Sequence, residues 1–150
     1  MARLEITIEA PKLDRFIAKM KRFPENAIEA MEMGVRRSLF VIERQAKLET
    51  PVSTGRLRSG FRIKVRGLQG TIFNRVKYAL FVHEGTEPHI ILPVIKKALW
   101  WKGADHPVKK VNHPGTASNP FMERALKKTR NIRDDIFQEE IQKALEKVKV

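Results

Sequence analysis

The stretch RLRSGFRIKVRGLQGTIFNRVK, residues 56–77, predicts a β-hairpin with one strongly basic face. Apolar and cationic side chains alternate through residues 56–66, which is the period of a strand with one buried face. The glycines of GLQG at 67–70 predict a turn, and TIFNRVK at 71–77 predicts the returning strand. We expect the apolar face to hold Leu57, Phe61, Ile63 and Val65, and the basic face to hold Arg56, Arg58, Arg62, Lys64 and Arg66.

The residues before the hairpin predict a strand and two helices. RLEITIE at 3–9 alternates as a half-buried strand does, and apolar residues at helical spacing predict a helix over 11–22. A longer amphipathic helix begins near Glu25, because apolar side chains recur at steps of three and four residues; they are Ile28, Met31, Val35, Leu39, Ile42 and Ala46. The turn-forming stretch TPVSTG at 50–55 ends this helix. Within it, Gly34 costs about 1 kcal/mol relative to alanine, and we expect it to be merely tolerated.

The residues after the hairpin predict shorter elements and one more helix. We expect a short helical turn over residues 78–83 and short strands near 89–92, 97–101 and 107–112. A last amphipathic helix is expected over 120–147.

Together these elements predict an α+β fold. Its antiparallel sheet contains the basic hairpin and packs against the long amphipathic helix and the C-terminal helix. We expect a single domain over residues 1–150, with a mobile loop at 84–120.

Composition excludes several classes of protein. The chain has 150 residues, of which 42% are hydrophobic and 31% charged, which fits a globular domain and excludes a collagen or a fully disordered chain. Cysteine is absent, so there is no disulfide, no thiolate nucleophile and no cysteine-ligated metal. The longest apolar run, 90–95, is far shorter than the about 20 residues that span a bilayer. Since the first ten residues also lack the apolar stretch of a signal peptide, we expect a soluble, intracellular protein with no membrane contact.

The net charge of +13 is concentrated in the middle of the chain. Residues 51–119 carry 12 basic and 3 acidic side chains, whereas residues 1–50 carry 10 and 8, and residues 120–150 carry 8 and 6. A clustered basic surface indicates a polyanionic partner or a strongly acidic protein surface. The alternative is a basic face that only keeps the protein soluble.

The sequence offers little for catalysis. HEGTEPH at 83–89 resembles a metalloprotease motif, but that motif needs two histidines four residues apart on one helix, and here they are six apart. Pairs of acids such as Glu139 and Glu140 are expected on the solvated face of the last helix. We expect no enzyme, no catalytic residue, no cofactor and no metal ion. A hydrolase built on the four histidines, which bound metal would reveal, is a remote alternative; they are His83, His89, His106 and His113.

The basic strand is the sharpest candidate for a site. Alternate residues of a strand lie about 6.6 Å apart, near the roughly 7 Å between phosphates along a nucleic-acid strand. This spacing leaves two hypotheses open: an acidic protein partner, or a nucleic-acid-binding module that contacts phosphates through the 56–77 hairpin. Phe73 is the only aromatic residue expected near the basic face, so base stacking is not indicated.

Three stretches, taken in order, carry a family resemblance. They are TPVSTGRLRSG at 50–60, VKYALFVHEGT at 76–86, and HPGTASNPFMERAL at 113–126. Together they resemble the head–tail joining family of tailed bacteriophages, also called neck or tail-completion proteins, over roughly residues 25–130. One departure is Ser53, which stands where the family more often has aspartate.

The resemblance implies a non-enzymatic virion assembly protein of a phage or prophage. Such a protein joins the portal-bearing head to the tail, or completes the tail, and works as an oligomer that forms a ring. The resemblance further implies assembly in the host cytoplasm, a final place at the head–tail junction of the virion, contacts with other head and tail proteins, and proximity to DNA. The basic strand would supply the polar contact surface. Trp100 and Trp101 are the candidates for a docking loop.

Overall fold

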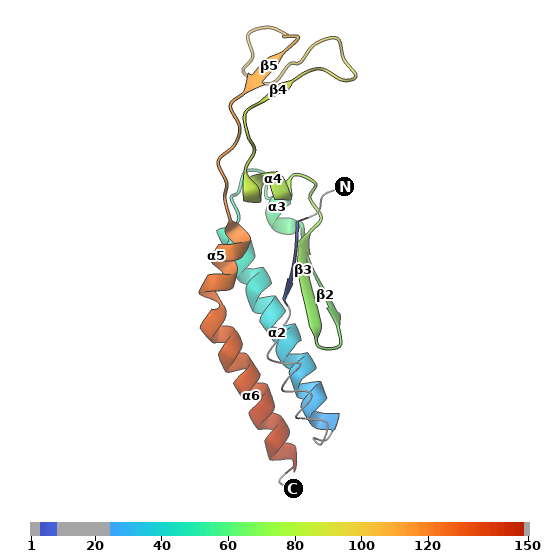
Figure 1. Cartoon of the computed structure of the whole chain (residues 1–150), viewed down its shortest axis with the longest axis vertical. Coiled ribbons are helices and arrows are strands. Elements are labelled where there is room, and N and C mark those ends of the chain that lie inside the picture. Colours follow the sequence, from blue (N-terminus) through green and yellow to red (C-terminus); the bar gives the residue numbers. More distant parts are fainter. Residues whose placement is uncertain (1–3, 9–24, 149–150) are drawn as a thin grey trace. The chain divides into compact units, whose positions relative to one another are not determined.

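A computed structural model describes residues 4–8 and 25–148 of the chain. The described residues fall into two compact units, one formed by the residues up to Ala79 together with those from Phe121 onward, and one formed by Leu80–Pro120. Figure 1 shows the elements of each unit. The helix predicted over 11–22 lies outside the described residues.

The first unit contains a three-stranded antiparallel sheet in the order β1–β3–β2. Its strands are β1 (Glu5–Ile8), β2 (Phe61–Arg66) and β3 (Gln69–Asn74). β2 and β3 form the predicted hairpin, and the pairing of Arg66 with Gln69 leaves a two-residue turn between them. Because β3 is the central strand, β2 lies at an edge of the sheet.

The structure corrects the predicted strand over 56–66. Its first part is a short helix, α3 (Arg56–Ser59), and the strand begins only at Phe61. Gly55 has a φ of 76°, a left-handed conformation that turns the chain before α3 and that glycine adopts without a steric penalty. Leu57 is buried as predicted, but its side chain belongs to this helix and not to the face of a strand.

The long helix α2 (Glu25–Glu49) forms the middle of the first unit. Five of its six predicted core positions are buried, namely Met31, Val35, Leu39, Ile42 and Ala46, whereas Ile28 is 50% exposed. One side of α2 packs against β2 and β3, and it also packs against the two C-terminal helices. The sheet approaches closely at Gly70 of β3, because a Cβ there would lie 2.8 Å from Val35 Cγ1 and closer still to Leu39 Cδ1.

The predicted helix over 120–147 is divided at Thr129 into α5 (Phe121–Lys128) and α6 (Arg130–Val148). The Thr129 hydroxyl donates a hydrogen bond of 2.9 Å to the Ala125 carbonyl, a local bond that often bends helices. Phe121 is fully buried and meets the Phe61 ring edge to face, with centroids 6.1 Å apart. This contact joins α5 to the first residue of β2.

Gly34 has a structural role, contrary to the expectation that it is merely tolerated. A Cβ at this position would lie 2.7 Å from Cδ1 of Phe137, on α6. Glycine therefore allows the Phe137 ring to lie directly against the backbone of α2.

The second unit contains all of α4 (Ala79–Glu84) except its first residue, together with β4 (His89–Ile91) and β5 (Val111–His113). α4 confirms the predicted helical turn, and β4 confirms the strand near 89–92. The strand expected over 97–101 is wrong, because this stretch makes only an isolated antiparallel bridge, between Leu99 and Val108. The strand expected over 107–112 is shortened to β5.

Candidate functional site

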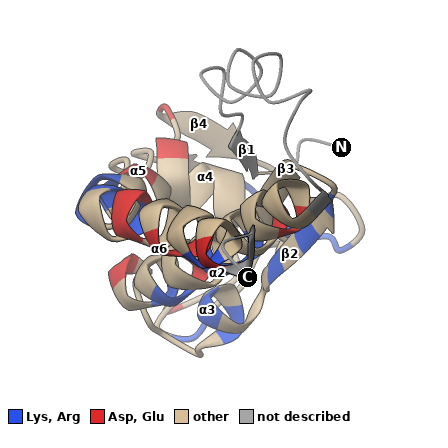
Figure 2. Cartoon of the chain, turned by 90° about the horizontal axis from the view of Figure 1, so that it is seen from below, with Lys and Arg blue, Asp and Glu red and all other residues tan. Residues whose placement is uncertain are grey.

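The exposed cations of β2 form a surface that we call the basic strand surface: Arg62, Lys64 and Arg66. The three side chains alternate with Phe61, Ile63 and Val65, whose face lies toward α2. Figure 2 marks Lys and Arg positions in blue along β2 and α3. Within residues 4–8 and 25–148, Lys64 and Arg66 make no ion pair. Among these residues, therefore, no acid neutralises their charge.

Arg62 is held in place by the backbone at the start of β2. Its Nη1 donates hydrogen bonds to the carbonyls of Ser59, at 2.9 Å, and Phe61, at 2.6 Å. The guanidinium therefore lies near the junction of α3 and β2. Several of its donors still face solvent, because a guanidinium carries five N–H groups.

The structure separates the other two predicted cations from this row. Arg56 and Arg58 lie on α3, so the spacing of a strand does not apply to them. Arg56 is exposed, whereas Arg58 is half-buried and its Nε has no hydrogen-bond partner among the described residues. The predicted row of five cations is thus a row of three, with Arg56 nearby in sequence.

Two further cations lie close to this surface in the sequence and were not predicted as site residues. Arg75 and Lys77 follow β3 directly and are exposed. From Thr50 to His83 the sequence has seven lysines and arginines and no acid. This absence of acids could have identified Arg75 and Lys77, because it does not depend on the two-residue alternation of a strand.

The second unit carries a long hairpin, residues 89–113, which we call the arm. Its β4–β5 base has three residue pairs, and reciprocal backbone bonds of 2.7 and 2.9 Å join Leu99 and Val108 further out. Trp100 is 66% exposed and Trp101 is 49% exposed. Val94 and Ile95, which the sequence did not single out, are 96% and 97% exposed. Large apolar side chains this exposed mark a surface for another molecule.

The histidines do not converge. Among the described residues, no group of three or more metal-ligating side chains comes together. His89 and His113 face each other across β4 and β5 and stack with ring centroids 4.9 Å apart. His83 is buried on α4, and His106 is exposed in the arm.

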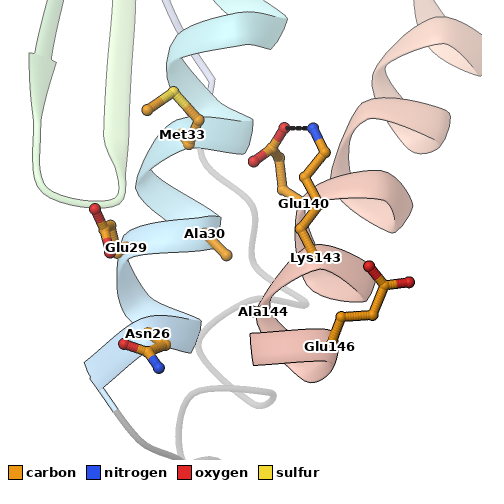
Figure 3. Close-up of a pocket in the computed structure, with 8 residues that line it drawn as sticks. All are labelled: Asn26, Glu29, Ala30, Met33, Glu140, Lys143, Ala144 and Glu146. Atoms are coloured by element: carbon orange, nitrogen blue, oxygen red, sulfur yellow. Dashed lines mark hydrogen bonds and ion pairs between the residues drawn. The ribbon is translucent and has the colours of Figure 1, made fainter. Parts of the chain in front are cut away.

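A groove opens between the N-terminal part of α2 and the C-terminal part of α6; we call it the helix groove (Figure 3). Its volume is about 490 Å³. Its apolar lining comes from both helices: Ala30, Met33 and Ala144. Its acidic side chains are Glu29, Glu140 and Glu146, with Lys143 and Asn26 completing the lining.

Glu140 corrects the expectation that the acids of α6 are all solvated. It is buried, and its carboxylate accepts hydrogen bonds from Arg37 of α2 and from Lys143, the latter at 2.9 Å. Lys143 and then Arg37 hold the pKa of Glu140 below its ordinary value, although partial burial opposes the shift. Arg37 also pairs with Glu139 at 3.0 Å, so this cluster joins α2 to α6.

A second cluster joins the end of α2 to α5. Glu49 accepts hydrogen bonds from Lys128 at 2.6 Å, Gln45 at 2.7 Å and Arg124 at 3.1 Å. These donors lower the pKa of Glu49 to about 2. The carboxylate is therefore ionised through the neutral range, and its role is to hold the helices together.

The geometry defines a class of protein: a small α+β protein with a basic edge strand, an apolar arm and no helix among the described residues that is long and apolar enough to cross a membrane. Residues 14–85 match a family model described as "Bacteriophage HK97-gp10, putative tail-component". The match confirms the resemblance to the phage head–tail joining family. It includes the long helix and the basic hairpin, and it ends before the arm begins. No curated protein and no solved structure matches the chain.

The family match supports a phage tail component with a structural role in the virion. It implies contacts with other phage structural proteins. It gives no support to the alternative of a nucleic-acid-binding module acting through the 56–77 hairpin.

Proposed function

We propose that this protein is a non-enzymatic assembly protein that joins the head to the tail, or completes the tail, of a phage particle. The observation that carries the proposal is the basic strand surface: a row of exposed cations on an edge strand, with no ion pair among the described residues, within the segment that matches the tail-component family. This surface would meet an acidic patch on a neighbouring head or tail protein.

The proposal includes an oligomer at the head–tail junction, assembled in the host cytoplasm. A ring of identical subunits repeats one heterologous contact around an axis. It would also repeat the basic strand surface, so that three cations per subunit become a belt of positive charge. Such a belt can face an acidic protein ring, and it can lie near the DNA that passes through the junction.

The exposed position of the three cations makes the surface testable without disturbing the core. In the double variant Arg62→Glu with Lys64→Glu, we expect the free energy of unfolding to fall by about 1–2 kcal/mol, because Arg62 loses its two hydrogen bonds to backbone carbonyls while the core is unchanged. The yield of infectious particles should fall at least tenfold, because two attractive contacts become repulsive.

A matched control changes the same net charge elsewhere. Lys127→Glu with Arg130→Glu reverses two exposed cations on α5 and α6, and we expect near-normal particle yield. Normal yield from the β2 variant, in a protein that folds normally, would remove the proposal. Salt-sensitive binding of purified protein to duplex DNA, lost in the β2 variant, would favour a nucleic-acid contact in place of the acidic protein.

A further inference from the structure

The arm exposes apolar side chains that the described residues do not cover. Val94 and Ile95 are almost fully exposed, and the two tryptophans follow within six residues. The backbone around them is defined by the Leu99–Val108 bridge and by a turn in which the Ala104 N–H donates to the Trp101 carbonyl. An apolar surface held on a hydrogen-bonded hairpin has the character of a binding element.

The charge of the arm narrows the kind of partner. No acid occurs between Glu87 and Asp105, and three lysines flank the apolar side chains: Lys96, Lys97 and Lys102. All three are exposed, and no ion pair involves them within the described part of the chain. The complementary surface is an apolar depression with carboxylates around it.

The helix groove has this character. Its buried apolar lining includes Ala30 and Ala144, and Met33 adds a flexible apolar side chain. Glu29 and Glu146 are exposed beside it. A volume of about 490 Å³ is sufficient for a large aromatic side chain.

We propose that the arm of one copy of this chain docks into the helix groove of a second copy, with a tryptophan against the apolar lining and Lys102 beside Glu146. The inference rests on the proposed function, since it names the contact that would build the ring. The two surfaces differ, so the contact is heterologous, and each subunit gives an arm and receives one. It needs no other phage protein.

Crosslinking tests the geometry directly, because the chain has no cysteine of its own. Lys102→Cys and Glu146→Cys are made as separate single variants, mixed at high concentration and oxidised. We expect a disulfide-linked dimer in the mixture at several times the yield of either variant alone. The control replaces Glu146→Cys by Asp134→Cys, which lies on the same helix about 18 Å away.

Two crosslinking results would overturn the inference. One is a mixture that links no better than the Asp134 control. The other is the chain carrying both cysteines linking within itself when dilute, because the groove would then be filled by the arm of its own chain.

Charge exchange provides a second, independent test. Glu146→Lys and Lys102→Glu should each weaken self-association about five- to tenfold, measured by light scattering over a concentration series. The two changes in one chain should restore it, since the pair is re-formed with its signs exchanged. Asp134→Lys should have no effect. Failure of the double variant to recover would overturn the inference.

Failure of the docking between copies can be distinguished from failure of the proposed joining role. If Trp101→Ala lowers particle yield without changing self-association, the arm binds another phage protein. The docking between copies is then wrong, while the joining role stands. If self-association follows the charge exchange but the β2 variant gives normal particles, the docking stands and the joining role through the basic strand surface is wrong.

Discussion

The close approach of β3 to α2 allows a double-mutant cycle with a predicted coupling energy. Leu39 is 1% exposed, so Leu39→Ala should cost about 3 kcal/mol of unfolding free energy, within the range for buried leucines. Gly70→Ala places a methyl group against Leu39 and Val35. Its overpacking penalty of about 1–3 kcal/mol exceeds the gain of about 0.5–1 kcal/mol from replacing a strand glycine. We expect a net loss of about 1 kcal/mol.

The double variant should be more stable than the sum of the single effects indicates. Removing the Leu39 side chain opens space that the methyl group introduced by Gly70→Ala then fills, while Val35 still limits the fit. We expect a total loss of about 2–3 kcal/mol instead of about 4, which is a coupling energy of at least about 1 kcal/mol.

Urea unfolding followed by far-UV circular dichroism measures these energies. Tryptophan fluorescence would not report on this core, because both tryptophans lie in the arm. The slopes with urea should agree among the four proteins, which shows that the same surface is exposed on unfolding. Additive effects, within about 0.5 kcal/mol, would mean that Gly70 and Leu39 are not in contact and that the packing of the sheet on α2 is different.

Three further predictions concern the Glu49 cluster, the buried Asn74 and the arm. The pKa of Glu49 is about 2 in the folded protein against an ordinary 4.5, so the folded state binds fewer protons; its stabilisation is complete above about pH 4.5 and declines as the pH falls toward 2. The melting temperature of Glu49→Gln should therefore change less with pH across that window than that of the unmodified protein. Asn74 is buried and donates to the Leu57 carbonyl at 2.8 Å, so Asn74→Ala should cost about 1–3 kcal/mol in urea unfolding, whereas a neutral result would contradict the bond. Acrylamide should quench Trp100 and Trp101 efficiently in dilute protein, and protection at high concentration would accompany docking of the arm.

The periodic elements could be predicted from the sequence because their burial follows one simple rule. The steps of three and four in α2 match the side chains that the sheet and the C-terminal helices cover. The alternation from Phe61 to Arg66 likewise matches a strand with one covered face. The strand predicted over residues 56–60 is wrong because a four-residue helix is too short to show its own period. Leu57 is buried in either conformation, so its apolar character does not distinguish them.

The site was only partly predictable. Of the five cations predicted for the basic face, the three on β2 follow from alternation alone, whereas Arg56 and Arg58 lie on α3. The pairing of Glu140 with Arg37 joins residues 103 positions apart, and no local pattern indicates which acid of α6 turns inward. The same holds for the helix groove, which exists only where two distant helices meet. The sequence does not mark Val94 and Ile95 as surface residues, because apolar residues usually belong to a core, whereas this chain exposes both.

The order of strands in the sheet has a consequence for synthesis of the chain. β2 and β3 are joined by two residues and can pair as soon as both leave the ribosome. β1 is made first, yet its partner β3 begins some 60 residues later. Closing that long loop costs more chain entropy, so this pairing forms more slowly. Until then, one edge of β3 has open backbone groups that another nascent chain could pair with. Growth at lower temperature or slower expression should therefore raise the fraction of correctly folded protein.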